Sequence, residues 1–338
     1  MSARPPRLID VALAAGVHSS TASRVLTGDA SVSIRDDTKI RVIEAAERLR
    51  YRPSALGRGL RTSATGSFGM LVPSLRNPLY AELVRGAFDR AWERGYVVVL
   101  FEDTGAKAAT MAYERLVDEG RIDGVLVASA YAGSPTVALF SQGDLPCVFV
   151  GRQVPGTLRN VTLREEDAGA QAAAHFVSLG HTRLGHLAGP QLLDTAVRMA
   201  RGFERVCGDA GVEHTTIYAS GDERSGFAAM RRLLVGERSP TAIFVSHLSL
   251  AVGALAAARS VGRAVPNELS IVCYDDPILE YLDPAVTAVR MPLHELGSAA
   301  VDRLVASTKG SPIADVEVKT SPQLIVRSST ASPNDRRP

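Results

Sequence analysis

Residues 8–28 read LIDVALAAGVHSSTASRVLTG. The apolar residues of this stretch have the spacing of two short helices that meet at a steep angle. They are Val11, Ala15, Val17, Ala22 and Val25. Ala12 is small enough to admit the second helix, and Gly16 suits a tight turn with a positive φ. The stretch therefore predicts a helix-turn-helix.

The second of these helices is predicted to face DNA. Ser19 is expected to cap it, and its outward residues include Ser20, Thr21 and Arg24. A major groove admits such a helix, with its first turns at the base edges and its first amides near phosphate. Two alternatives stay open: a helical hairpin that only packs has the same pattern, and Arg24 could contact a phosphate instead of a base.

A third helix is predicted from about Asp37 to Leu49. Its residues Ile40 and Ile43, with either Ala46 or Leu49, are expected to close a three-helix core. We therefore expect the N-terminal domain to contain three helices.

The segment YRPSALGRGLRTS, residues 51–63, predicts only a marginal helix. Ser54 can cap a short helix that runs through Leu60. Gly57 and Gly59 each cost about 1 kcal/mol of helix stability relative to alanine, so the segment should not hold a helix by itself.

The basic charge of the chain is concentrated in its N-terminal fifth. Residues 1–62 contain 11 Arg and Lys against 6 Asp and Glu, whereas the remaining residues contain 27 against 30. A segregated basic module is typical of a nucleic-acid partner, although a solvated surface gives the same count.

Composition excludes several classes of protein. The 338 residues exceed one ordinary core, so two or three domains are expected. No apolar run is long enough to span a membrane, and MSARPPRLID has no hydrophobic segment for secretion, so we expect a cytoplasmic protein. Cys147, Cys207 and Cys273 are scattered and odd in number, which argues against a disulfide framework or a zinc cluster. We expect no metal and no cofactor.

From about Ser67, short apolar runs alternate with helical patterns, which predicts parallel sheets covered by helices on both faces. A first series of strands ends at PCVFV. A second series follows near LGHLA, TTIYA, AIFVS and LSIVCY. The fold class is therefore α/β, with two sheets in two subdomains.

The chain resembles the LacI/GalR (lactose-repressor) family of bacterial transcription regulators over nearly its whole length. IDVALAAGVHSSTASRVLTG resembles the DNA-binding opening of that family, YRPSALGRGLR its hinge, and FGMLVPSLRNPLYAELVRG the start of its effector-binding core. DGVLVAS, LPCVFVGR, LGHTRLGHLAGP and VPNELSIVCYDD follow in the order of the family.

This resemblance implies an N-terminal helix-turn-helix domain, a hinge with a minor-groove helix, and a periplasmic-binding-protein-like core of two doubly wound parallel-sheet subdomains. The chain would cross between the subdomains three times. The implied ranges are 1–50 for the first domain, 51–65 for the hinge and 66–338 for the core, divided into an N-subdomain of about 66–162 and 292–325 and a C-subdomain of about 163–291.

In the hinge, the resemblance implies that Leu60 enters the minor groove beside its dimer mate and pries a base step apart. Ala55 and Leu56 would belong to the same DNA-binding segment. A simple packing role for Leu60 is the alternative.

In the core, ligands of open α/β sheets bind beyond the carboxyl ends of the strands, which directs attention to the cleft between subdomains. Leu79, Tyr80, His247 and Asp275 match effector-contact positions of the family. Asp275 would accept hydrogen bonds from ligand hydroxyls, and His247 stands where the family usually has asparagine. Tyr80 as a core residue, Asp275 as a helix cap and His247 as a satisfied loop histidine are the structural alternatives.

An arginine usual in the family is displaced in this chain. The sequence TAVRMARGF has Met199 at the usual place and Arg198 one residue earlier. A shift of one residue turns a helical side chain by about 100°. Arg198 is kept as a candidate effector contact, and the sequence leaves open whether Arg198 or Met199 faces the cleft.

The resemblance implies a ligand-responsive transcription regulator, most often a repressor, that binds double-stranded operator DNA as a homodimer on a pseudo-palindromic site. Its effector would be sugar-like or another small polar molecule. The alternatives are a solute-binding protein and a cytoplasmic sugar-processing protein with the same core. GxSxG, HExxH and a phosphate-binding glycine loop are absent, and His181 and His186 are interpreted as structural, so we do not expect an enzyme.

The end of the chain, SSTASPNDRRP, is short and polar and is predicted to fray. A tetramer built by a helical tail is therefore not expected.

Overall fold

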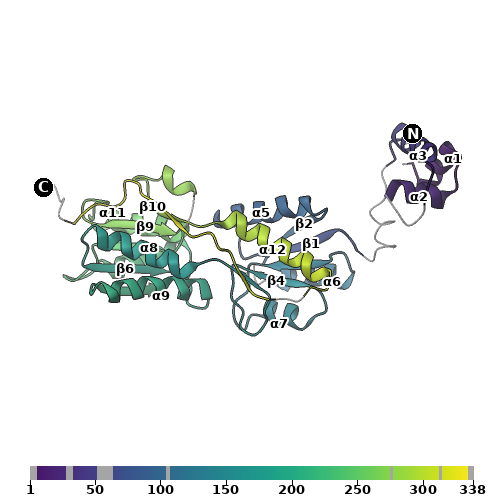
Figure 1. The fold of residues 1–338 in the computed structure, drawn as a ribbon. Helices are drawn as coiled ribbons and strands as arrows, with labels where there is room; N and C mark the ends of the chain where they lie inside the picture. The colour runs from purple at the N-terminus through teal and green to yellow at the C-terminus, as the bar shows by residue number, and fades with distance from the viewer. Residues whose placement is uncertain are drawn as a thin grey trace. The chain divides into compact units, whose positions relative to one another are not determined.

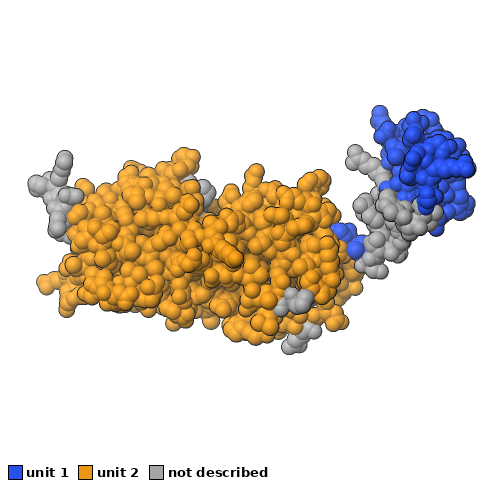
Figure 2. Space-filling model, in the orientation of Figure 1, with its two compact units in different colours: residues 1–66 blue, residues 67–338 orange. Residues whose placement is uncertain are grey.

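The computed structural model describes residues 6–27, 33–51, 64–103, 107–274, 277–311 and 314–333. The chain forms two compact units, residues 1–66 and residues 67–338, which Figure 2 distinguishes by colour. Each unit has its own buried apolar residues, so each has its own core.

Among its described residues, unit 1 has the helices α1 (Leu8–Ala15), α2 (Ser19–Thr27) and α3 (Asp36–Arg48). Gly16 has a φ of 65° and ends α1 in the left-handed conformation, as the sequence predicts. Val11, Ala15 and Ala22 are buried in the core, and Val17 and Val25 pack against it. The helix-turn-helix prediction is therefore confirmed.

The predicted cap of α2 is wrong. Ser19 is the first residue inside the helix, and His18 holds the position before it. The backbone N–H of Ser20 donates to Nδ1 of His18 over 3.3 Å, and the N–H of Thr21 donates to the carbonyl of His18. An imidazole nitrogen therefore accepts the hydrogen bond that we assigned to a serine hydroxyl.

The predicted core face of α3 is right for Ala46 and Leu49, which lie in or against the core, and wrong for Ile40 and Ile43. Ile40 and Ile43 are 56% and 47% exposed, whereas Val42, Ala45 and Ala46 are buried. The small alanines let α3 approach the other two helices closely, and a larger side chain at these positions would keep the helices apart.

Unit 2 contains two six-stranded sheets, each of which forms a lobe with its own helices (Figure 1). The first lobe has the strand order β11-β5-β4-β3-β1-β2, and all of its pairings are parallel. Its elements are β1 (Ser67–Val72), α5 (Leu79–Glu93), β2 (Val97–Glu102), α6 (Lys107–Asp118), β3 (Gly124–Val127), α7 (Pro135–Gln142), β4 (Cys147–Val150), β5 (Asn160–Thr162), α12 (Leu293–Thr308) and β11 (Val316–Glu317).

The second lobe has the strand order β12-β10-β9-β8-β6-β7, with only β12 antiparallel to its neighbour among the described strands. Its elements are α8 (Glu165–Ser178), β6 (Arg183–Ala188), α9 (Asp194–Asp209), β7 (Glu213–Tyr218), α10 (Glu223–Leu233), β8 (Ala242–Val245), α11 (Leu248–Ser260), β9 (Ser270–Tyr274), a 3₁₀ helix (Pro277–Tyr281), β10 (Thr287–Arg290) and β12 (Gln323–Ile325). The predicted fold class is confirmed.

The chain crosses between the lobes after β5, after β10 and between β11 and β12, which makes three crossings. Residues 323–325, which we expected in the N-subdomain, lie in the second lobe because they pair with β10.

The residues that follow β12 are also held by the second lobe. Ser329 is fully buried, and its carbonyl accepts a hydrogen bond from the N–H of Ile271 over 2.8 Å. Its hydroxyl oxygen accepts a second hydrogen bond from the N–H of Thr287, and Nε2 of His181 lies 3.0 Å from the carbonyl oxygen of Ala331. The prediction that the polar tail frays is therefore wrong for the residues up to 333.

Three pairs of helices cross at facing glycines. At the crossing of α8 and α9, a Cβ on Gly169 would lie 2.0 Å from the carbonyl oxygen of Met199, and one on Gly202 would lie 1.8 Å from that of Glu166. Reciprocal glycines occur in the same way where α10 meets α11 and where α5 meets α12. The crossings therefore bring backbone against backbone, closer than any other residue allows.

We expect Gly202→Ala to destabilise unit 2 by about 2–3 kcal/mol, because the new methyl group can only be accommodated by separating α8 from α9. Gly208→Ala is the matched control in the same helix, since nothing lies within 4 Å of its Cβ position. The control should be neutral or stabilising by about 0.5–1 kcal/mol. Urea denaturation of both variants measures the difference, and equal effects would contradict the close crossing.

The pH dependence of stability is expected to include a large contribution from His186. This residue is fully buried on β6, its ring lies 5.0 Å from that of Phe244, and its Nε2 is 3.0 Å from the hydroxyl of Ser246. Burial lowers its pKa to about 3. As the pH falls, the unfolded chain takes up a proton on this imidazole that the folded chain excludes. The contribution of neutral His186 to the unfolding free energy is therefore fully present above about pH 6.5 and is lost as the pH falls below it.

Between pH 7 and pH 4.5, we expect His186→Gln to remove about 2–3 kcal/mol of the decline in unfolding free energy. His214→Gln, at an exposed position on β7, should leave the decline unchanged. Denaturant titrations at a series of pH values measure both slopes. A wild-type slope in the His186 variant would show that the buried imidazole does not titrate on unfolding.

Candidate functional site

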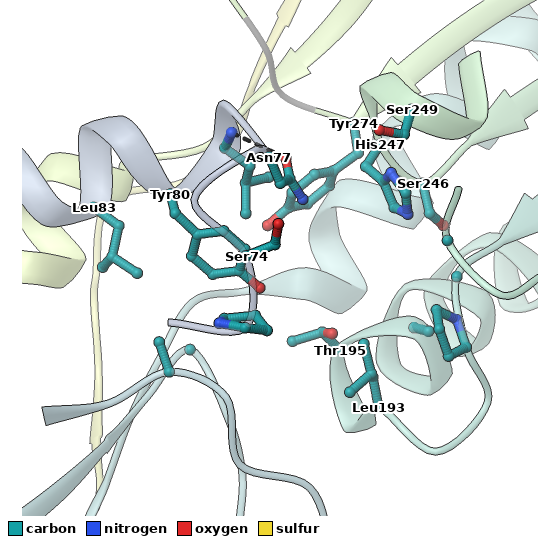
Figure 3. Close-up of a pocket in the computed structure, with 18 of the residues that line it drawn as sticks. Ser74, Asn77, Tyr80, Leu83, Leu193, Thr195, Ser246, His247, Ser249 and Tyr274 are labelled. Atoms are coloured by element: carbon teal, nitrogen blue, oxygen red, sulfur yellow. Dashed lines mark hydrogen bonds between the residues drawn. The ribbon is translucent and has the colours of Figure 1, made fainter. Parts of the chain in front are cut away.

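A cavity of about 470 Å³ lies between the two lobes of unit 2. Its lining includes residues at or directly after the carboxyl ends of the parallel strands of both lobes, such as Ala128, Val150, Ser246 and Tyr274. Figure 3 shows side chains from the two lobes converging on this space. The cavity thus lies where open α/β sheets bind their ligands.

Leu79 and Tyr80, two of the predicted effector contacts, both line the cavity from the start of α5. The side chain of Asn77 orients the start of this helix, because its Oδ1 accepts a hydrogen bond from the N–H of Leu79 over 3.1 Å. The ring of Tyr80 packs in the core of the first lobe, while its hydroxyl accepts a hydrogen bond from Arg152 over 3.1 Å. Tyr80 therefore serves both as a core residue and as a polar group of the cavity.

His247, the third predicted contact, lines the cavity from the opposite lobe, immediately before α11. Its Nδ1 is buried and has no hydrogen-bond partner in the described part of the chain. Burial lowers its pKa to about 4, against a smaller opposing effect of Glu223, so the ring is neutral near pH 7. A neutral imidazole has one donor and one acceptor nitrogen.

Arg198 does not line the cavity, contrary to our expectation. Its Nη1 lies 2.8 Å from Glu165 Oε2 and donates to the carbonyl of Leu163 over 2.8 Å, while its Nη2 lies 3.0 Å from Asp194 Oδ2. Burial raises the pKa of Glu165 to about 7, although the positive charge of Arg198 opposes this effect. The one-residue displacement in the sequence therefore turns this arginine toward the first crossing between the lobes.

The cavity face of α9 is formed instead by Thr195 and Met199. These two residues are four apart, so they project from the same side of the helix. The question that the sequence left open is answered in favour of Met199.

Arg152 is a residue of the cavity that our sequence analysis missed. It lies two residues after the end of β4, lines the cavity and is buried. Its Nη1 donates to the carbonyl of Gly151 and to the hydroxyl of Thr195, at 3.2 and 3.3 Å. The available signal was a charged residue two positions after the apolar run CVFV, beyond the carboxyl end of a predicted strand.

The outward face of α2 has the predicted arrangement. Ser20 and Arg24 are exposed, Ser19 and Thr21 are half-buried, and Ala22 is fully buried on the core side. The Ser20 hydroxyl is 2.8 Å from Nδ1 of His18, which fixes its position on the exposed face. The helix therefore presents a short polar and basic surface.

Four of the predicted site residues, Ala55, Leu56, Leu60 and Asp275, lie outside the described residues. Within the described ranges, no three His, Cys, Asp or Glu side chains are grouped closely enough to hold a metal ion. In the same ranges, no helix has both the length and the apolar character needed to cross a membrane.

Two family models match the chain. "Bacterial regulatory proteins, lacI family" matches residues 7–54, and "Periplasmic binding protein-like domain" matches residues 173–330. The HTH-type transcriptional regulator MalR of Streptomyces coelicolor is 34% identical, with 98% of each chain covered. The HTH-type transcriptional repressor PurR of Edwardsiella ictaluri is 30% identical, with 95% of this chain and 96% of the relative covered.

Solved structures agree with these matches. The Lac repressor dimer bound to operator and the anti-inducer ONPF has a TM-score of 0.83 at 25% identity, with 97% of this chain and 100% of that chain covered. A complex of the transcriptional regulator CelR with cellobiose has a TM-score of 0.72 at 28% identity, with 96% and 99% covered. The chain belongs to the LacI family and is a DNA-binding regulator of transcription.

The ion cluster of Arg198 gives a direct prediction for stability. Arg198→Met leaves the carboxylates of Glu165 and Asp194 without their cation, and we expect it to cost about 3–5 kcal/mol of unfolding free energy. Arg201→Met removes an exposed pair with Glu166 from the same helix and should cost less than about 1 kcal/mol. Denaturant titration compares them, and a small loss at Arg198 would show that the cluster does not hold the crossing segment to the second lobe.

Proposed function

We propose that this regulator is a dimeric repressor that binds a pseudo-palindromic operator through α2 of both subunits. A small polar effector that binds in the cleft raises or lowers its affinity for the operator. The observation that carries this proposal is the pairing, in one chain, of the exposed Ser20 and Arg24 face with a cavity between two lobes. A solute-binding protein would need the cavity and not the basic helical unit. Its operator and its effector would both be encountered in the cytoplasm.

Exposed apolar side chains support the dimer. Phe88 and Trp92 of α5 and Val97 and Val99 of the edge strand β2 are all exposed, with Trp92 at 78%. On the second lobe, the 3₁₀ helix exposes 79% of Tyr281. Large apolar groups gathered on adjacent elements mark protein interfaces. A second copy on this surface would present two copies of unit 1 to two half-sites of the operator.

The cavity supports an effector of modest size. Its volume of about 470 Å³ falls in the range of small-molecule sites. The hydroxyls of Ser74, Ser246 and Tyr274 and the neutral ring of His247 supply polar groups from both lobes (Figure 3). A hydroxylated, sugar-like molecule suits this lining, and the cellobiose named for CelR is of that class.

The coupling between effector and operator follows from the position of the cavity. A ligand that contacts both lobes favours the lobe arrangement it fits best, and it can change operator affinity only by its difference in affinity for the two arrangements. The hinge residues Ala55, Leu56 and Leu60 are proposed to transmit this change, with Leu60 in the minor groove.

Operator binding tests the role of α2. We expect Arg24→Ala to weaken binding to chromosomal fragments selected by the wild-type protein by about tenfold to a hundredfold, because a lost base contact is worth about 1–3 kcal/mol. Arg41→Ala, an exposed position on α3, removes the same charge from unit 1 and should change specific binding much less. Mobility-shift titrations in the presence of random competitor DNA measure both. Equal losses of operator affinity in the two variants would show that Arg24 contributes only its positive charge and not a specific contact to a base.

A further inference from the structure

We propose that the ligand of the cleft is an acid: a small hydroxylated molecule whose carboxylate or phosphate group binds Arg152. This inference rests on the proposed role of the cleft as an effector site, and it narrows the effector from polar molecules in general to anions.

The first support is the state of Arg152 itself. The side chain is only 9% exposed, yet it lines the cavity. Its guanidinium donates to neutral oxygens only, from Gly151, Thr195 and Tyr80. Its Nε is buried and has no hydrogen-bond partner in the described part of the chain. A guanidinium stays charged at every accessible pH, so a buried cation is left with unfilled hydrogen-bonding capacity.

The second support is that no carboxylate contacts Arg152 directly. Among the described residues, no carboxylate lies within ion-pair distance of Arg152, although its positive charge, like that of Arg198, opposes the rise in the pKa of Glu165 that burial causes. Glu165 also lines the cavity, but its carboxylate is held by Arg198, which is shared with Asp194. Burying a charge without a direct partner costs free energy of folding, and we infer that the arrangement is retained because it strengthens ligand binding. An anionic ligand would place a negative charge directly beside the guanidinium.

The third support is the direction of the helices around the cavity. Lining residues come from the first turns of α5, α8, α9, α10 and α12, and from the position before α11. Each helix start contributes partial positive charge from its free N–H groups, so these dipoles add to the field of Arg152. The acids Asp222 and Glu223 also line the cavity, but they are exposed, and Asp222 caps α10 through the N–H of Ser225. These helix starts therefore add positive potential to the part of the cavity where Arg152 and Glu165 are buried.

The neutral polar groups of the cavity are suited to contact the rest of the expected ligand. His247 carries no charge near pH 7 and cannot replace Arg152 as the partner of an anion. With the hydroxyls of Ser74 and Ser246, it suits the hydroxylated remainder of the molecule. Arg152 also links the lobes through Thr195, so an acid at this position would contact both sides of the cleft.

The first experiment needs no knowledge of the ligand. If Arg152 is kept for an anion, Arg152→Met should leave the melting temperature of the ligand-free full-length protein unchanged or raise it. Arg198→Met should lower the melting temperature clearly, because it leaves the carboxylates of Glu165 and Asp194 without their cation. A fall with Arg152→Met as large as that with Arg198→Met would show that Arg152 is a structural cation and would overturn the proposal.

The second experiment measures the charge preference by calorimetric titration of the full-length protein with glucose, glucuronate, galactose, galacturonate and glucose 6-phosphate. We expect an acid to bind at least about tenfold more tightly than its parent sugar, and Arg152→Gln to remove the difference. Arg85→Gln, at an exposed position of α5 outside the cavity lining, is the matched control and should preserve it. Preference for a uronate or for the phosphate identifies which acid group the site takes.

Three results would overturn the inference: no acid binds at millimolar concentration, a parent sugar binds as tightly as its acid, or Arg152→Gln leaves the preference intact. Operator binding by the same preparations separates this failure from failure of the proposed function. A protein that selects its operator and responds to a neutral sugar remains a regulator, and only its effector class changes.

Discussion

The ion cluster of Arg198 with Glu165 and Asp194 is the interaction on which the arrangement of the core depends. Glu165 begins α8 directly after the chain enters the second lobe, and Arg198 reaches it from α9 while also holding the carbonyl of Leu163 in the crossing segment. A cluster at this point ties the crossing to the body of the second lobe. Movement of one lobe against the other must therefore be accommodated around it, and the cleft lies at that boundary.

The facing glycines give the same region its stiffness. Because α8 and α9 touch through their backbones at Gly169 and Gly202, their starting residues are held at fixed positions on the cavity wall. The pairs α5 with α12 and α10 with α11 repeat this construction. Rigid helix starts position polar groups such as Tyr80, Thr195 and His247 before any ligand arrives. Preorganisation of this kind lowers the entropic cost of binding.

Much of the fold can be predicted from the sequence because its signals are local. The small residues and Gly16 of the helix-turn-helix, and the apolar runs that alternate with helical patterns, each depend on a few neighbouring positions. The failures concern choices that tertiary packing decides. Ile40 and Val42 are equally apolar in a sequence, and only the approach of α1 and α2 selects Val42 for the core.

The cleft shows the same division. Its location and the places of Leu79, Tyr80 and His247 follow from strand ends and from the family resemblance. The direction of Arg198 depends on where α9 begins, and the importance of Arg152 depends on Thr195 and Tyr80, which are distant in sequence. Hydrogen bonds between such distant residues leave no periodic pattern. The buried hydrogen bonds of Ser329 were missed for the same reason.

The most direct test of the coupling between cleft and operator is the operator dissociation constant of the full-length protein, measured with and without a ligand that binds the cleft. We expect the ligand to change this constant by about fivefold to 150-fold, and operator DNA to change the affinity for the ligand by the same factor. An operator affinity that stays constant at saturating ligand would contradict that coupling.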